Sequence, residues 1–393
     1  MSAATQASVD RAAKVRPQWT RVLPASEALG LEGRTLLHAG PVALDPAKLP
    51  PPMRHSAMLS CLHEGWAKTP EEAYGLLAAG KVAMAPSHTR SVATPLVSMV
   101  SPRTTVAEIV DANGTGRYHA FLGTGGGPQQ RFGSADPAIL ARLQFRDTVL
   151  LQGFRDLLDA PVDLLSLARS ALREGDDLHN RLSSATTLLQ ALFTTRKADT
   201  DAAKQAIQTI VEAPLYFLNV WMPACQLMLL AGEGVKGSTF VTRLCANGET
   251  MGIQVAGLPG QWFTAPATLV QGPFMKGAPE NPQHPPATGD SGVIDAFGLG
   301  GQGLRHAPSL ISAFAPWITA DDDARARAMM VGEHPILETP FGIDAAAVAS
   351  TNRAPMLSTG MVSADGRGLL GRGICAVPVA PFATAAAAVA AAT

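Results

Sequence analysis

The sequence predicts an α+β protein in which mixed α/β N-terminal and C-terminal parts enclose an all-helical segment. Three observations favour this fold class. Helix and strand signals alternate over residues 1–135, helical periodicity runs almost unbroken over 136–235, and short strands with glycine turns return over 236–393. We take these three ranges as the predicted domains, a number that suits a chain of 393 residues.

The clearest element of the N-terminal part is a helix that starts at Thr69. Thr69 suits the N-cap, Pro70 suits the first helical position, and the two glutamates that follow favour the positive end of the helix dipole. The helix should end at Gly80. A short strand over 81–85 and an exit loop over 86–88 follow.

In the middle part, Asp136 and Pro137 open a helix whose apolar residues recur at helical spacing. Four more segments share this period: 162–172, 182–193, 201–212 and 216–230.

The C-terminal part begins with a predicted β-hairpin, because Asn247-Gly248 separates two strand-like segments. The Pro- and Gly-rich range 272–289 reads as a long surface loop. The apolar segment 293–297 is expected to be a strand, followed by a glycine-rich turn and a helix that starts near Pro308.

Composition excludes several classes of partner. Only 16% of the residues are charged, the net charge is −1, and no basic run reaches five residues, which argues against nucleic acid and acidic membranes. The four cysteines lie far apart in apolar surroundings, as reduced buried thiols do. The N-terminus lacks the order of a signal peptide, and the Ala-rich stretch 383–392 is too short to span a bilayer. We expect a soluble cytoplasmic protein.

The densest polar chemistry lies at 174–181, between two predicted helices. This stretch holds three acids, a histidine, an asparagine and an arginine. Asp176 and His179 are three residues apart, which would place them on one face of a helical turn and let the carboxylate orient the imidazole. The stretch is equally consistent with a capping network or a polar-ligand site. No other His or Cys has metal-ligand spacing, so we expect no metal.

Two glycine-rich segments are candidates for anion binding. Gly298, Gly300, Gly301 and Gly303 form a G-x-G-x-x-G pattern, whose backbone amides can approach a phosphate. A dinucleotide site and a tight structural turn are the alternatives, and a strand ending in an acid at the required distance is missing. The second segment is 123–127, followed by Arg131, whose guanidinium can pair with phosphate or carboxylate.

Two further polar residues stand at turns. His38 ends a strand-like run at a Gly-Pro turn, where ligand groups are often placed. Asp290 lies between Gly289 and Ser291, in a pattern that superficially matches a serine-protease loop but has no partner triad.

Taken in order, these segments resemble the AllG (YlbE-like) family, which is linked to oxamate carbamoyltransferase. The resemblance covers roughly residues 10 to 380. The segments that carry it are His38-Ala39-Gly40-Pro41, Glu64-Gly65-Trp66-Ala67, Pro86-Ser87-His88, Arg131-Phe132-Gly133, Gly175-Asp176, His179-Asn180-Arg181, Asn247-Gly248, Trp262-Phe263-Thr264-Ala265-Pro266, Gly289-Asp290-Ser291, Phe297-Gly298-Leu299-Gly300-Gly301 and Gly342-Ile343-Asp344.

The resemblance implies a three-part α+β fold and a carbamoyltransferase subunit in the salvage of allantoin nitrogen. Its reaction would convert oxalurate and phosphate to oxamate and carbamoyl phosphate, with no other cofactor. The partners it implies are an FdrA-like subunit and a third subunit, so we expect a homo- or hetero-oligomer.

The resemblance also suggests roles for individual residues. The catalytic candidates are His179, Asp176, His38 and Asp290. The candidates for substrate or anion binding are Arg131, Arg181, Asn180, His88, Glu64, Asn247, Gly298, Gly300 and Gly301.

The chain departs from the family pattern at Thr94, at Thr124 and at Asp295-Ala296. These changes fall on polar positions, so a related ureido or amide acid is an alternative substrate. A non-catalytic scaffold or ligand-binding subunit of an FdrA-like, CoA-ligase-related complex is the alternative function.

Overall fold

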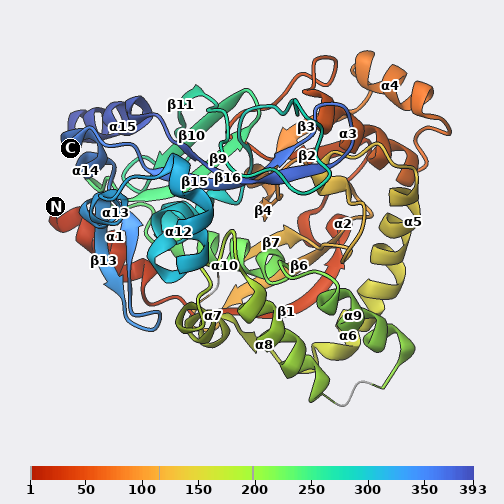
Figure 1. The fold of residues 1–393 in the computed structure, drawn as a ribbon, viewed down its shortest axis with the longest axis horizontal. Helices are drawn as coiled ribbons and strands as arrows, with labels where there is room; N and C mark the ends of the chain where they lie inside the picture. Colours follow the sequence, from red (N-terminus) through yellow and green to blue (C-terminus); the bar gives the residue numbers. More distant parts are fainter. Residues whose placement is uncertain (1, 115, 197–198) are drawn as a thin grey trace.

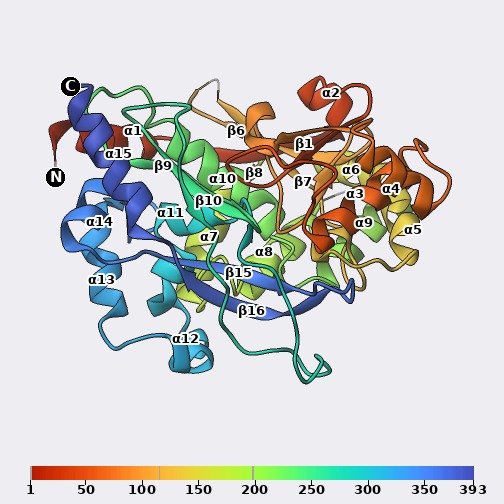
Figure 2. The same ribbon diagram turned by 90° about the horizontal axis from the view of Figure 1, so that it is seen from above.

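The computed structural model describes residues 2–114, 116–196 and 199–393 and shows an α+β fold, as predicted (Figure 1). Both termini lie at the same end of the molecule (Figures 1 and 2). The helices in chain order are α1 (Ala3–Ala12), α2 (Ala25–Leu29), α3 (Pro51–His63), α4 (Pro70–Ala78), α5 (Ala138–Phe145), α6 (Leu151–Leu157), α7 (Leu164–Arg173), α8 (Ser183–Thr194), α9 (Asp201–Val211), α10 (Leu218–Leu230), α11 (Gly292–Phe297), α12 (Pro308–Phe314), α13 (Asp322–Met329), α14 (Ala345–Thr351) and α15 (Val379–Ala391).

The N-terminal part contains a five-stranded sheet with the strand order β4-β7-β6-β1-β8. Its long strands, β1, β6 and β7, are antiparallel, and the β1–β6 register shifts between Trp19 and Arg21. The strands are β1 (Pro17–Pro24), β4 (Val92–Ala93), β6 (Thr105–Asp111), β7 (Arg117–Phe121) and β8 (Val162–Asp163). Strand β8 occupies the first two residues of a segment that we predicted to be helical.

A three-stranded sheet, β3-β2-β5, lies beside it. Its strands are β2 (Thr35–His38), β3 (Ala83–Pro86) and β5 (Met99–Val100). β2 and β3 run parallel, so the chain must cross over between them, and α3 and α4 form that crossover. Helix α4 confirms the predicted start, because the Thr69 side chain accepts a hydrogen bond from the Glu72 amide.

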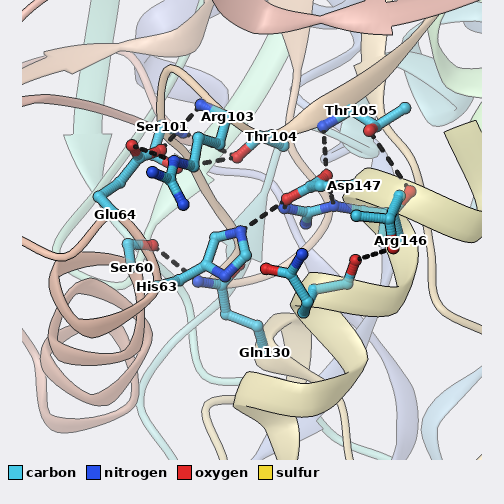
Figure 3. Close-up of polar contacts among 12 residues, drawn as sticks. Ser60, His63, Glu64, Ser101, Arg103, Thr104, Thr105, Gln130, Arg146 and Asp147 are labelled. Atoms are coloured by element: carbon cyan, nitrogen blue, oxygen red, sulfur yellow. Dashed lines mark hydrogen bonds and ion pairs between the residues drawn. The ribbon is translucent and has the colours of Figure 1, made fainter.

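Helix α3 is tied to the α5–α6 region by a buried group that we call the Arg146 cluster (His63, Thr105, Arg146 and Asp147). Figure 3 shows Asp147 between Arg146 and His63. Asp147 accepts two hydrogen bonds from Arg146, at 2.6 and 2.7 Å, and one from the Thr105 amide at 2.7 Å. His63 Nε2 lies 2.7 Å from the same carboxylate. Arg146 opens a π-helical turn, Arg146–Leu150, between α5 and α6.

The helical segment is packed into the rest of the molecule. Trp19 of β1 lies 5.2 Å from Phe154 of α6, between ring centroids, and Trp221 of α10 lies 6.4 Å from Phe297 of α11. One hydrophobic core therefore includes side chains from all three predicted ranges. The domain boundaries after residues 135 and 235 stay a prediction.

The C-terminal part confirms the predicted hairpin at Asn247-Gly248, between β9 (Val241–Asn247) and β10 (Thr250–Val255). These two strands join β11 (Phe263–Pro266) and β12 (Thr288–Gly289) in a four-stranded sheet. Two more hairpins follow. Their strands are β13 (Met330–His334), β14 (Thr339–Ile343), β15 (Met356–Val362) and β16 (Leu369–Ala376).

The segment 293–297, which we predicted to be a strand, is the buried helix α11 instead. A short apolar run fits a buried strand and a buried helix equally well, so periodicity could not decide between them. The predicted loop 272–289 crosses the free edge of β16, where the Met275 amide donates to the Leu370 carbonyl at 2.7 Å. Figure 2 shows this loop projecting from the body below β15 and β16.

Across the described residues, no helix has both the length and the apolar character that a bilayer span requires.

Candidate active site

A small cavity forms where the 174–181 turn meets the β15–β16 hairpin and the Arg131 turn. Its volume is about 40 Å³, which suits a group of a few atoms. Four of its lining side chains are strongly polar: Arg131, His179, Asn180 and Arg372. We call it the inner cavity. The other lining residues are Pro95, Leu96, Phe132, Leu215, Leu218, Ser291, Thr359, Gly360 and Leu369.

His179 lies at ion-pair distance from Asp295. Its Nδ1 atom lies 2.9 Å from Asp295 Oδ2, and both side chains are buried. The other carboxylate oxygen accepts the amides of Gly301 at 2.8 Å and Ser358 at 3.0 Å, which fixes the carboxylate in place. A carboxylate at Nδ1 favours the tautomer with its proton on that nitrogen and leaves Nε2 for proton transfer. Burial raises the pKa of Asp295, and the contact with His179 opposes that shift.

The prediction that Asp176 orients His179 is wrong. Asp176 Oδ2 accepts the Ala185 amide at 2.9 Å, at the start of α8, and its Oδ1 lies 3.4 Å from Arg181 Nε. The prediction assumed a helical turn, but Leu178 has a φ of 60° and reverses the chain. Asp177 holds this turn instead, because it accepts the amides of residues 179, 180 and 181 at 3.2, 3.3 and 2.7 Å.

Arg131 brings an uncompensated positive charge to the inner cavity. The residue is 6% exposed, and its guanidinium lies over the Phe132 ring at 4.7 Å from the centroid. Within the described residues, no carboxylate reaches it and its Nε atom has no hydrogen-bond partner. Burial, together with the nearby charge of Arg372, lowers the pKa of Arg131 to about 10.

Arg372 of β16 is the second cation of the cavity. Its Nη1 atom donates to the Asn180 carbonyl at 2.8 Å, and burial lowers its pKa although Asp177 opposes the shift. No carboxylate lies within ion-pair distance of Arg372 in the described part of the chain. Two buried like charges cost free energy unless an anion compensates them. The cavity therefore favours an anionic ligand.

Two other predicted binding residues of the 174–181 turn are also placed near the cavity. Asn180 is held by its own side chain, whose Nδ2 donates to Ser358 Oγ at 2.7 Å. Arg181 is not part of the inner lining but lines a neighbouring cavity with Ser183 and Ser309.

The structure places His38 and Asp290 outside the lining of the inner cavity. Asp290 accepts hydrogen bonds from Ser87 Oγ at 2.5 Å, from Thr94 Oγ1 at 2.9 Å and from the Thr94 and Gly40 amides. His38 Nδ1 lies 2.7 Å from the Ala39 carbonyl, its Nε2 accepts the Leu44 amide, and burial lowers its pKa. Neither side chain lines the cavity, and both have partners within the protein. Their catalytic role stays a prediction.

Glu64, His88 and Asn247 also lie outside the cavity lining. Glu64 accepts the Arg103 amide at 2.8 Å, as Figure 3 shows beside the Arg146 cluster. His88 lies against the Trp262 ring, at 4.9 Å between centroids, and burial lowers its pKa to about 4. Asn247 accepts the two amides that follow its hairpin turn, at 3.1 and 2.7 Å.

The glycine loop at 298–303 supports the His179–Asp295 pair and does not present free amides. The Gly300 amide donates to the Asp177 carbonyl at 3.0 Å, and the Gly301 amide donates to Asp295. Gly298 ends α11 with a φ of 117°. A Cβ atom at Gly300 would lie 2.6 Å from Asp295 Oδ1 and 2.9 Å from His179 Cβ, so only glycine lets the loop close here. These amides already have acceptors within the protein, and their phosphate-binding role stays a prediction.

Sequence reasoning named Asp295 only as a departure from the family pattern and did not name Arg372. Asp295 is the one acid in the apolar stretch from Gly292 to Gly301. A lone acid in a buried apolar segment needs a polar partner, and that requirement is a usable signal. Arg372 lies in a strand of small and apolar residues, but nothing in its sequence context links it to Arg131.

The described residues contain no group of three or more His, Cys, Asp or Glu side chains arranged to hold a metal ion. The fold and the inner cavity together define an α+β protein with a small buried cavity that is lined by two arginines and by the histidine of a His–Asp pair.

Comparison with known proteins identifies the family. The model of the family described as oxamate carbamoyltransferase subunit AllG matches residues 82–291. The oxamate carbamoyltransferase subunit AllG of Escherichia coli (strain K12) is 30% identical over 407 residues, which cover 96% of this chain and 95% of that protein. The chain therefore belongs to the AllG family.

Two further relatives have no stated function. The uncharacterized protein YahG of Escherichia coli (strain K12) is 28% identical, over 97% of this chain and 84% of that protein. A crystal structure of a conserved protein of unknown function from Enterococcus faecalis V583 superposes with a TM-score of 0.92 at 26% identity, and covers 99% of this chain and 97% of that one.

Proposed function

We propose that this chain is a carbamoyltransferase subunit and that the inner cavity is the site of transfer. The substrates are a small ureido acid and phosphate, with oxalurate giving oxamate and carbamoyl phosphate. The family relationship supports the reaction class, since the relative is named for oxamate carbamoyltransferase. No cofactor other than phosphate enters this proposal.

One observation carries the proposal. Arg131 and Arg372 face the same cavity without a carboxylate partner in the described chain, next to the His179–Asp295 pair. Acyl-type transfer from a ureido acid to phosphate needs cations for the reacting anions and a group that moves a proton. The cavity offers both within a small apolar enclosure.

The proposed step moves one proton and exchanges one bond. A phosphate oxygen attacks the terminal ureido carbonyl carbon, the bond from that carbon to the inner nitrogen breaks, and carbamoyl phosphate forms. The phosphate hydroxyl proton passes to His179 Nε2 and then to the leaving oxamate nitrogen, so total charge is conserved. Asp295 holds the His179 ring and its Nδ1 proton throughout and is a positioning residue.

The family relationship supports a multi-subunit assembly, because the relative is named as a subunit. We propose that the partners are an FdrA-like subunit and a third, smaller subunit, and that the complex works in the cytoplasm in allantoin nitrogen salvage.

The test is an assay of phosphate-dependent oxamate release from oxalurate by the chain co-purified with these partners. Asp295→Asn keeps an acceptor for the Gly301 and Ser358 amides but turns an amide donor towards His179, which disfavours the active tautomer. We expect turnover to fall by about a hundredfold or more, with an altered pH profile. The surface variant Arg353→Ala, which loses one exposed ion pair with Asp321, is the control and should retain turnover.

The alternative is a non-catalytic scaffold or ligand-binding subunit. If Asp295→Asn retains full turnover with an unchanged pH profile, the catalytic proposal is contradicted and the alternative of a scaffold or ligand-binding subunit remains.

A further inference from the structure

A second, larger cavity adjoins the inner one, and we call it the outer cavity. Its volume is 360 Å³. The two cavities share Asn180, Leu215 and Arg372 as lining residues, so they meet at the Arg372 side chain. The remaining residues of the outer cavity are Arg181, Leu182, Ser183, Pro214, Ser309 and Leu310.

The outer cavity has its own cation with hydroxyl groups on both sides. Arg181 Nη1 donates to Ser309 Oγ at 3.2 Å, and Arg181 Nε lies 3.4 Å from Ser183 Oγ. Asp176 holds the Nε side of this guanidinium at 3.4 Å. Within the described residues, the Nη2 group has no hydrogen-bond acceptor, and 38% of the side chain is exposed. A guanidinium fixed on one side and open on the other, with serine hydroxyls beside it, suits a carboxylate.

The inner cavity differs in size and in charge. Its 40 Å³ fits a compact group, and its guanidinium, Arg131, is buried and has no compensating carboxylate in the described chain. The more highly charged reactant gains most from such a site, because buried charges attract more strongly than exposed ones. Phosphate carries more charge than a monocarboxylate and is more compact than a ureido acid.

We propose that the two cavities bind the two reactants at the same time, with phosphate in the inner cavity and the carboxylate of the ureido acid or of oxamate in the outer one. Arg372 lies between them and contacts both anions. The carbamoyl group then lies at the junction, beside His179 and Asn180. This inference rests on the proposed function and adds the placement of each reactant.

The test is isothermal titration of the purified full chain with inorganic phosphate and, separately, with oxamate. Arg181→Ala should weaken oxamate binding by about tenfold to a hundredfold and leave phosphate affinity within about twofold. Arg131→Ala should weaken phosphate binding by about tenfold to a hundredfold and leave oxamate affinity within about twofold. Oxamate should still bind when phosphate is saturating, and the Arg353→Ala control should bind both ligands as the wild type does.

Three results would overturn the inference: competition between phosphate and oxamate, equal weakening of both ligands by Arg181→Ala, or no oxamate binding by the wild-type chain. The turnover assay separates this inference from the proposed function. If Arg181→Ala leaves the dependence of turnover on oxalurate concentration unchanged, the placement of the reactants is contradicted and the proposed function is not. Separate binding of both ligands without turnover by the assembled complex contradicts the proposed function alone.

Discussion

The Arg146 cluster and the inner cavity contain the same residue types but differ in whether a carboxylate compensates the charge of the buried arginine. Each places a buried arginine near a histidine and an aspartate. In the Arg146 cluster, Asp147 takes two hydrogen bonds from Arg146 and one contact from His63, so the acid compensates the cation (Figure 3). In the inner cavity, Asp295 is used by His179 and by two amides, and Arg131 has no carboxylate among the described residues.

This difference separates a structural site from a candidate functional one. Burial raises the pKa of Asp147, but the charge and hydrogen bonds of Arg146 and the bond from His63 outweigh that effect and lower it overall. Asp295 has a raised pKa, and Arg131 has a lowered one. A compensated group stabilises the fold, whereas uncompensated groups lower stability until a ligand binds.

The largest effect should come from the proton-transfer residue. His179→Gln removes the titratable ring but keeps a polar side chain, and we expect turnover of the assembled complex to fall by about 10² to 10⁴. The measurement is steady-state oxamate release, with the thermal midpoint of the variant as a folding control. Turnover within a few-fold of the wild type would show that the chemistry lies elsewhere.

In the Arg146 cluster, the main effect should be on stability. Asp147→Ala leaves Arg146 buried and uncompensated, and we expect a loss of about 3–5 kcal/mol in the free energy of unfolding. Denaturant titration measures this loss. The exposed pair Arg353–Asp321 provides the matched control, because Arg353→Ala should leave the unfolding midpoint nearly unchanged. Equal midpoints for the two variants would contradict the description of Asp147 as the compensating acid.

Arg131→Met should change the free energy of unfolding in the direction opposite to Asp147→Ala. The lowered pKa of Arg131 means that the folded state disfavours its charge at neutral pH, so removing the charge should increase the free energy of unfolding by up to about 3 kcal/mol. Methionine keeps most of the packing volume. The measurement is the denaturation midpoint in phosphate-free buffer. A clear loss of stability would mean that Arg131 is a structural arginine like Arg146.

A smaller effect concerns His334, a buried histidine outside both sites. Burial lowers its pKa to about 4, and its Nδ1 atom accepts the amides of Ile336 and Leu337. Between pH 6.5 and 4 the unfolded chain binds a proton that the folded chain does not, so stability falls as the pH decreases. We expect this residue to account for about 2 kcal/mol of the loss between pH 7 and pH 5.

His334→Asn keeps an acceptor for the two amides and does not titrate. Its free energy of unfolding should therefore depend less on pH than that of the wild type over this range. Identical pH dependence in the two proteins would show that His334 has the same pKa in the folded and the unfolded states, which would contradict the lowered pKa of the buried imidazole.

The fold was largely predictable because its signals are local. The Thr69 cap, the Asn247-Gly248 hairpin and the helix that begins at Pro308 each depend on a few adjacent residues, and each is present. Helix α11 was assigned the wrong type because six buried residues show no distinctive period.

The candidate site was only partly predictable because it is assembled across long sequence separations. Local sequence selected His179 and Arg131 correctly as residues that line one cavity. The acid beside His179 comes from 116 residues further along the chain, whereas the nearby Asp176 turns towards α8. Spacing cannot reveal a partner that only tertiary packing supplies, and Arg372 is a second example.

The central claim is that Arg131 and Arg372 hold an anion in the inner cavity. A crystal of the full chain soaked in arsenate, a phosphate analogue, tests it directly through anomalous scattering at the arsenic edge. We predict a peak within hydrogen-bond distance of both guanidinium groups and beside His179. Arsenate bound at other positions, with no peak in the inner cavity, would contradict the claim.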